Sequence, residues 1–172
     1  MKAWYFSQQN CKLRYKDNRL IKAGVTHYYD GMPILCEQGL HASKNILNAL
    51  KYAPGAYIWR VEMGGTSFCD HDKMVATERT YLWGYDATNV LRHFARLCAL
   101  DVIHLWDAPD VAIQYLKTGD ENLRRAARNA AWGAAWSAAG SAAWSAAWSA
   151  ARSAAVQKQS HRLYKMIMDG RR

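Results

Sequence analysis

Apolar and polar residues alternate over short stretches in the first half of the chain, and a two-residue period of this kind is typical of β-strands. The pattern predicts strands at residues 2–7, 56–63 and 79–83. The pair Gly64-Gly65 follows the second of these and is expected to end it. We therefore expect the first half of the chain to contain a sheet.

One helix is predicted between the first two strands. Residues 44–53 carry apolar side chains at helical spacing, and Ser43 before them is a suitable N-cap. Pro54-Gly55 is expected to end this helix. Residues 10–35 mix short extended pieces with turns, and the pattern assigns them no long element.

The apolar period changes to three or four residues after Asp86, which indicates helices. It predicts one helix over residues 88–105 and another that begins near Pro109. Asp107 is expected to cap the second helix, because an aspartate oxygen accepts hydrogen bonds from the free N–H groups at a helix start.

Residues 126–157 repeat a four-residue unit, which reads AARN, AAWG, AAWS, AAGS, AAWS, AAWS, AARS, AAVQ. Alanine is the best helix former, so this region is predicted to be helical. Four residues exceed one helical turn, so each unit is rotated by ~40° from the one before it. One straight groove therefore cannot hold all the tryptophans of the repeat, which are Trp132, Trp136, Trp144 and Trp148.

The length of this helix is itself informative. An unbroken helix over residues 121–168 would be ~72 Å long, whereas a compact chain of this size is ~40 Å across. Gly140 replaces tryptophan near the middle of the repeat. We expect the helix to break there into a hairpin; the alternative is a long helix that pairs with another subunit or partner.

Together these elements predict an α+β protein with two domains. Residues 1–85 are expected to form a small mixed-sheet domain. Residues 86–172 are expected to form an all-α region, a bundle or a hairpin, that contains the repeat of residues 126–157.

Charge is distributed unevenly along the 172 residues, whose formal net charge is +9. Residues 1–60 carry nine Lys/Arg and three Asp/Glu, residues 61–120 carry five and nine, and residues 121–172 carry nine and two. One interpretation is attraction to an anionic partner, either nucleic acid or an acidic protein. The other is solubility, together with attraction between the acidic middle and the basic ends.

The cysteines and the first residues favour a cytoplasmic protein. The four cysteines are widely spaced and form no CxxC pair, so we expect reduced thiols and no zinc site. The opening residues MKAWYFSQQN lack the apolar segment of a secretory signal. Cys69-Asp70-His71-Asp72 combines metal-binding residue types, but neighbours in an extended segment point to opposite sides, so no metal site is expected there.

A membrane span is also not expected. Residues 129–151 contain no charged residue and are long enough to cross a bilayer. They consist almost entirely of Ala, Ser, Gly and Trp, and Ala contributes little to membrane insertion while Ser and Gly oppose it.

The tryptophans of the repeat form a candidate partner-binding surface. Tryptophan is frequent at interface centres, and stacked aromatic rings with nearby arginines can bind single-stranded nucleic acid. The alternative is packing of these side chains against the protein's own N-terminal domain. The residues of this candidate surface are Trp132, Trp136, Trp144, Trp148, Arg128 and Arg152.

Residues 39–43 (GLHAS), the helix that ends at Tyr52, and the strand AYIWRVEMGG resemble the middle of the ADP-ribosyltransferase fold of the poly(ADP-ribose) polymerase type. The resemblance covers residues 25–63 best and extends over residues 1–85. It implies NAD as the cofactor of an enzyme, with the ring of Tyr52 stacked on nicotinamide. It also implies contacts of His41 and Ser43 with the nicotinamide ribose, and Glu78 as the catalytic carboxylate.

The chain also departs from that family, whose first strand carries a His or Arg that anchors NAD. Residues 3–7 (AWYFS) contain neither. No P-loop, dinucleotide-binding glycine loop, HExxH or nucleophile elbow is present either. The sequence therefore favours a degenerate transferase-like fold that binds a macromolecule and needs no cofactor.

Most of the chain resembles a second family, which is common in bacteriophages and bacteria. The resemblance rests on GLHAS, on KMVATERTYLW, on CALDVIHLWDAPDVAIQYLKTGDENLRRAARNAAW and on the alanine-rich repeat. It implies a phage or mobile-element setting and no particular biochemical activity. In that setting we expect a phage-type protein of the host cytoplasm whose partner is a host or defence protein, with nucleic acid less favoured. This expectation rests on the Trp-bearing repeat, the uneven charge and the incomplete catalytic set. Two alternatives stay open, namely an active NAD-dependent ADP-ribosyltransferase and a structural protein that self-assembles through the repeat helices.

Overall fold

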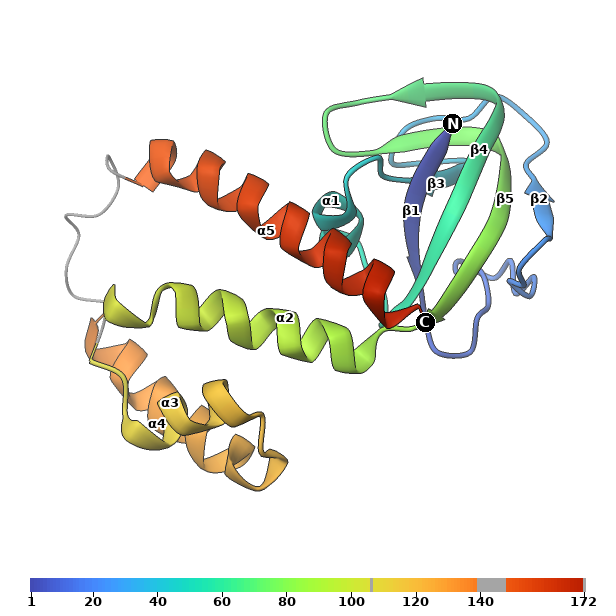
Figure 1. Ribbon diagram of the computed structural model, residues 1–172. Helices are drawn as coiled ribbons and strands as arrows, with labels where there is room; N and C mark the ends of the chain where they lie inside the picture. The colour runs from blue at the N-terminus through green and yellow to red at the C-terminus, as the bar shows by residue number, and fades with distance from the viewer. Residues whose placement is uncertain (106, 139–147, 172) are drawn as a thin grey trace. The chain divides into compact units, whose positions relative to one another are not determined.

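The structure of the protein is a computed structural model that describes residues 1–105, 107–138 and 148–171. It is an α+β protein, as predicted, and its described residues form a five-stranded sheet and five α-helices (Figure 1). The chain divides into two compact units. The first, here called the N-terminal unit, contains Met1–Thr88 and Leu163–Arg172, and the second contains Asn89–Arg162.

The sheet belongs to the N-terminal unit and is antiparallel throughout. Its strands run in the order β1-β4-β5-β2, and β3 also pairs with β5. The prediction of a mixed sheet was wrong. The two longest strands are joined by a short hairpin, and a connection of that length can only produce antiparallel neighbours. The strands are β1 (Lys2–Ser7), β2 (Thr26–Tyr28), β3 (Leu40–Ala42), β4 (Tyr57–Cys69) and β5 (Met74–Asp86).

The sheet curls until its two edges meet. Both β2 and β3 pair with the same edge of β5, one after the other along its length. Ser43, directly after β3, then pairs with Trp4 of β1 through two backbone hydrogen bonds of 2.8 and 3.0 Å. This contact saturates backbone groups that an open sheet edge would leave unpaired.

Both long strands extend further than the sequence pattern predicts. Gly64-Gly65 does not end β4, because the strand passes through a register shift between Gly64 and Ser67 and continues to Cys69. Gly65 adopts φ +66°, a left-handed conformation that glycine tolerates and that occurs in β-bulges with glycine at the first position. The glycine pair therefore bends the hairpin of β4 and β5 without ending it.

One face of the curled sheet holds the main apolar core. Two residues of the connection between β1 and β2, Leu13 and Ile21, are buried in this core. They cover strand side chains that belong to one contiguous cluster, namely Ala3, Leu40, Ala42, Trp59, Val61, Met63, Met74, Ala76 and Tyr81. The connection is therefore part of the folded unit, although the sequence pattern assigns it no element.

Helix α1 (Ile46–Lys51) packs beside β1 and buries Ile46 and Ala49. Its N-cap is Asn45, whose Oδ1 accepts a hydrogen bond from the Leu47 N–H at 2.8 Å. The prediction of Ser43 as N-cap was wrong, because the backbone of Ser43 is held in the sheet by Trp4.

The last turns of α5 complete the N-terminal unit. Leu163 and Ile167 are fully buried, and the Tyr85 hydroxyl donates a hydrogen bond to the Ile167 carbonyl at 2.8 Å. Tyr164 meets Trp4 edge to face, with ring centroids 6.0 Å apart. Figure 1 shows α1 and this end of α5 on the same side of the sheet. The remaining α-helices are α2 (Thr88–Asp101), α3 (Asp110–Thr118), α4 (Glu121–Ala138) and α5 (Trp148–Gly170), with a short 3-10 helix at Ile103–Leu105.

The second unit is helical, as predicted. Pro109 takes the N-cap position of α3 and offers no side-chain cap, so the prediction that Asp107 caps this helix was wrong. Gly119, at φ +72°, ends α3. Within this unit, Arg162 of α5 makes a bidentate ion pair with Asp101 of α2. Its Nη1 and Nη2 donate to the two carboxylate oxygens at 2.7 and 3.2 Å. The predicted helix break at Gly140 lies outside the described residues. Within the described ranges, no helix is both long and apolar enough to cross a membrane.

Candidate functional site

His41 is held entirely by backbone groups. Its Nε2 accepts a hydrogen bond from the Cys36 N–H at 3.0 Å, so the proton resides on Nδ1, which lies 3.1 Å from the Gly39 carbonyl. Burial lowers the pKa of His41, and the charges of Arg79 and Lys73 act in the same direction. Both ring nitrogens thus fix the turn before β3, in which Cys36 adopts φ +69°.

Tyr52 lies at the C-cap of α1 and is exposed. Its hydroxyl donates to Oδ2 of Asp72 at 2.6 Å, and the Lys51 ammonium binds the same oxygen at 2.9 Å. These two hydrogen bonds lower the pKa of Asp72, that from Tyr52 more strongly. The ammonium groups of Lys51 and Lys73 also lie 5.5 and 5.3 Å from the centre of the Tyr52 ring. Tyr52 therefore ties α1 to the turn between β4 and β5.

Glu78 is not brought to these residues. It lies in β5 opposite Gly64 and Tyr28, four residues after Met74. At the rise of an extended strand, four residues separate Glu78 by ~13 Å from the end of β5 that Tyr52 approaches through Asp72. Ser43 is buried and pairs with Trp4. The four residues implied by the transferase resemblance thus make separate contacts, and the assignment of NAD chemistry to them stays a prediction.

A buried arginine, which the sequence analysis missed, forms the centre of a polar cluster. Arg79 in β5 is only 2% exposed. Its Nε and Nη2 donate to the Tyr81 hydroxyl at 2.9 and 2.7 Å, and its Nη1 donates to the His41 carbonyl. The guanidinium also lies 3.8 Å from the centre of the Tyr5 ring. No carboxylate in the described part of the chain pairs with it, so oxygen lone pairs and an aromatic face stabilise its charge.

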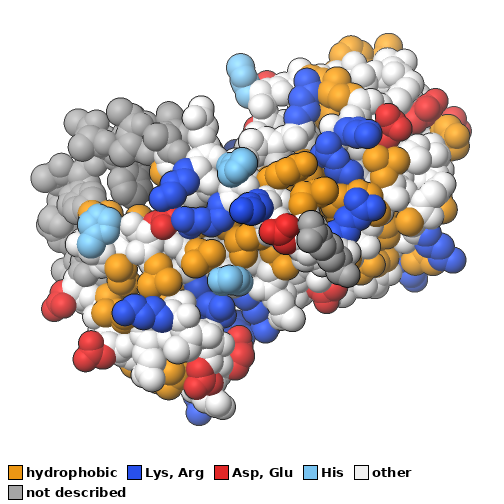
Figure 2. Space-filling model, in the orientation of Figure 1, with side chains coloured by type: hydrophobic (Ala, Val, Ile, Leu, Met, Phe, Trp, Pro, Cys, Tyr) orange, Lys and Arg blue, Asp and Glu red, His pale blue; other side chains and the backbone are white. Residues whose placement is uncertain are grey.

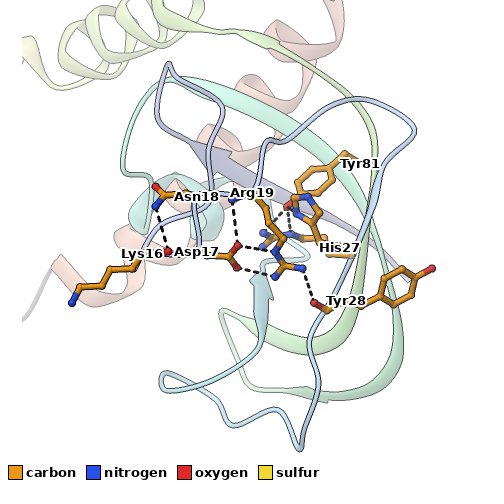
Figure 3. Close-up of polar contacts among 8 residues, drawn as sticks. Lys16, Asp17, Asn18, Arg19, His27, Tyr28 and Tyr81 are labelled. Atoms are coloured by element: carbon orange, nitrogen blue, oxygen red, sulfur yellow. Dashed lines mark hydrogen bonds and ion pairs between the residues drawn. The ribbon is translucent and has the colours of Figure 1, made fainter.

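The cluster extends from Arg79 through Tyr81 to His27. Because the Tyr81 oxygen accepts two bonds from Arg79, its own proton points to Nδ1 of His27, 3.2 Å away. Burial lowers the pKa of His27, helped by the charges of Arg19 and Arg79, and burial raises the pKa of Tyr81. The backbone of Leu20 acts on the pKa of His27 in the opposite direction, and more weakly than burial. This chain of contacts connects β5 to the segment before β2 (Figure 3).

That segment, residues 11–22, is here called the basic loop, and it is the blue coil after β1 in Figure 1. It contains five Lys/Arg and one Asp, a net charge of +4. Its two ends are paired, because the Leu13 N–H donates to the Arg19 carbonyl at 3.0 Å and the Ile21 N–H to the Cys11 carbonyl at 2.7 Å. With Leu13 and Ile21 in the core, the loop is firmly anchored to the sheet.

The tip of the basic loop has an unusual backbone. Tyr15, Lys16 and Asn18 adopt φ values of +59°, +68° and +57°. Asparagine tolerates this left-handed region, but tyrosine and lysine rarely enter it, at a cost of ~1 kcal/mol or more each. Tyr15 is 88% exposed, and the Arg14 guanidinium lies 4.8 Å from the centre of its ring.

Arg19 neutralises the one carboxylate of the loop. Its Nε and Nη2 bind the two oxygens of Asp17 at 2.7 and 2.8 Å, and its Nη1 donates to the Tyr28 carbonyl at 2.8 Å. The pair lowers the pKa of Asp17. Four cations of the loop are exposed and have no carboxylate partner among the described residues, and these are Lys12, Arg14, Lys16 and Lys22.

The second candidate surface, that of the repeat, is described only in part. Arg128 of α4 is exposed. The side chains of Trp132, Trp136, Trp144, Trp148 and Arg152 lie outside the described part, so the prediction of a partner-binding surface there stays a prediction. Figure 2 shows Lys and Arg side chains interspersed with hydrophobic ones over the visible face of the protein.

Comparisons of the chain with protein-family models, with curated proteins and with solved structures find no match. The two family resemblances therefore stay predictions. Among the residues that the structure describes, no group of three or more His, Cys, Asp and Glu is arranged to hold a metal ion.

Proposed function

We propose that the protein binds an anionic macromolecule and that the basic loop is the part of the N-terminal unit that receives it. This retains the prediction of a macromolecule-binding protein of phage type and specifies the charge of its partner. The observation that carries the proposal is the set of four exposed cations, without a carboxylate partner among the described residues, on a loop whose backbone is already fixed. A fixed loop loses little conformational entropy on binding, and clustered like charges speed the encounter with an opposite charge.

The contacts of Tyr52, His41 and Glu78 give less support to catalysis. Each of the first two uses its polar atoms within the fold, and Glu78 lies further along β5. A transferase-like fold used for binding is compatible with this arrangement. Self-assembly through the repeat helices stays a separate prediction.

The test is retention of the whole protein on immobilised heparin, a polyanion without bases. We expect the wild-type protein to bind at ~50 mM salt and to elute well above it, because several cations act together. A variant with Lys12, Arg14, Lys16 and Lys22 all changed to Gln should elute at clearly lower salt.

The matched control removes four exposed cations from other parts of the chain, namely Lys44, Lys117, Arg125 and Lys165, again to Gln. Both variants have the same net charge, so net charge alone predicts equal elution. Equal elution of the two, or no retention of the wild type, would overturn the proposal.

A further inference from the structure

The exposed ring at the tip of the basic loop points to the class of polyanion. Tyr15 leaves most of its surface in water, although a tyrosine ring gains free energy by burial. The backbone that displays it is left-handed at two successive non-glycine residues, Tyr15 and Lys16. Backbone strain of this kind persists when surrounding contacts impose it, and it is concentrated at binding sites.

The surroundings of Tyr15 are polar. Its neighbours along the tip are Arg14, Lys16, Asp17 and Asn18, and Arg14 covers one face of the ring. Aromatic anchors of protein–protein interfaces lie instead in desolvated, largely apolar surroundings. An aromatic ring flanked by free cations matches the surfaces that bind single-stranded nucleic acid, where bases stack on the ring and cations contact phosphates.

We infer that the basic loop binds single-stranded nucleic acid, with an unpaired base stacked on Tyr15 and the phosphates contacted by Lys12, Arg14 and Lys16. The inference rests on the proposed function and adds the class of partner. A duplex keeps its bases stacked on one another and offers Tyr15 no free base face. Stacking on any base is favourable, so no strong sequence preference is expected.

Tyr28 provides an internal control. It is 61% exposed, and its carbonyl is bound by Arg19 of the loop. Figure 3 shows its ring directed away from the cluster of His27 and Tyr81. Unlike Tyr15, it lies opposite a carboxylate in the sheet, that of Glu78, which repels phosphate. Tyr28 is therefore an exposed tyrosine of the same unit that should not bind the single-stranded nucleic acid.

The experiment is fluorescence anisotropy of a labelled single-stranded oligothymidylate of about 20 nucleotides, titrated with the whole protein. We expect Tyr15→Ala to weaken binding by about tenfold. Tyr15→Phe and Tyr28→Ala should stay within about twofold of the wild type, because the first keeps the ring and the second is outside the site. Thermal unfolding of each variant checks that the fold is intact.

Salt dependence separates stacking from charge. Three phosphate contacts give a slope of about −2 for log K against log salt concentration on a single strand. The double variant Lys12→Gln, Lys16→Gln should reduce the slope by about 1.4, whereas Tyr15→Ala should leave it unchanged.

Three results would overturn the inference while leaving the proposed function in place, provided that heparin is still retained through the loop. They are a Tyr15→Ala variant that binds like the wild type, a duplex that binds as tightly as the single strand, and loop-dependent binding of poly-L-glutamate with none of the oligonucleotide. The last would identify an acidic protein as the partner. Loss of heparin retention as well would remove both proposals.

Discussion

Two tyrosines of the N-terminal unit stand among lysines and arginines, and their surroundings differ in one respect. The hydroxyl of Tyr52 is bound to Asp72, which also binds Lys51. Tyr15 has cations on both sides in the sequence, but the nearby Asp17 is occupied by Arg19. One cluster of charges is therefore neutralised within the fold, while the other is left to the solvent.

This difference shows why residue types alone do not define a binding site. Each region contains an aromatic ring, cations and an aspartate. At Tyr15 they are neighbours in the sequence, whereas the fold brings Asp72 and Lys73 to Tyr52. At Tyr52 the carboxylate faces the ring's hydroxyl and lowers the local positive charge. At Tyr15 the nearby carboxylate of Asp17 is bound by Arg19 instead. The positive charges of Arg14 and Lys16 therefore stay unneutralised, and one face of the Tyr15 ring stays open.

Arg79 joins β5 to β3 and to the Tyr81 hydroxyl within the sheet, and its removal should have the largest effect. Arg79→Met keeps the volume but leaves the Tyr81 hydroxyl and the His41 carbonyl without their donors. Because buried polar groups without partners are costly, we expect the free energy of unfolding to fall by ~3 kcal/mol, measured by urea denaturation.

Arg60→Met is the matched control for Arg79→Met. Arg60 is a partly buried arginine of the same sheet, stacked 4.5 Å from the centre of the Trp4 ring, and no described oxygen accepts a hydrogen bond from it. It should cost ~1 kcal/mol. Equal losses for both variants would mean that the hydrogen bonds of Arg79 contribute little.

Acid should weaken the contacts through which His27 and Tyr81 connect the sheet to the basic loop. The pKa of His27 is below its ordinary value of 6.5 in the folded protein, so the unfolded chain binds this proton more readily. Stability contributed by neutral His27 is therefore complete above pH 6.5 and is lost as pH falls through the lowered pKa. The lowered pKa of His41 affects stability in the same direction. The lowered pKa values of Asp17 and Asp72 affect stability only near and below pH 3.8, which is the ordinary pKa of an aspartate.

The measurement is urea denaturation at a series of pH values from 7.5 to 5.0. His27→Gln should lower stability at pH 7.5 and make its decline with acid shallower. His93→Gln, a change at an exposed position of α2, should keep the wild-type slope. A slope that His27→Gln leaves unchanged would assign the acid sensitivity to other groups.

The smallest effect is expected from a substitution that makes the surroundings of Tyr52 similar to those of Tyr15. Asp72→Asn takes the carboxylate from Tyr52 and frees the charges of Lys51 and Lys73. We expect the affinity for the single-stranded oligonucleotide to rise by about twofold to fivefold at low salt, because a second cationic and aromatic surface becomes available. Asp107→Asn makes the same charge change at an exposed position of the second unit and should have a smaller effect. If the two raise affinity equally, only net charge matters.

Short-range patterns predicted the positions of the main elements but not their extent. The strand at residues 2–7 and the α+β class follow directly from alternation and helical spacing. The strand predicted at 56–63 continues to Cys69 because β5 lies beside it and provides partners that a local pattern does not contain. The pair Gly64-Gly65, which a local pattern takes as the end of a strand, forms a bulge within the strand here.

The candidate site was harder to predict, for a physical reason. Arg79 looks like an ordinary exposed charge in the run ERTYLW, and its burial depends on Tyr5 and on the His41 carbonyl, both distant in sequence. The left-handed backbone at Tyr15 could not be predicted from the sequence either, because no glycine stands at or beside that position. Only the excess of positive charge in residues 1–60 was accessible to sequence analysis.

The placement of the last turns of α5 affects synthesis of the protein. Leu163 and Ile167 seal one face of the sheet, yet they are translated after the whole alanine-rich repeat. A nascent chain that carries every strand therefore still exposes an apolar surface on the ribosome, where chaperones and proteases recognise such surfaces. A frameshift or stop codon within the repeat would leave the sheet unsealed, so cellular quality control would remove truncated copies even though their strands are intact.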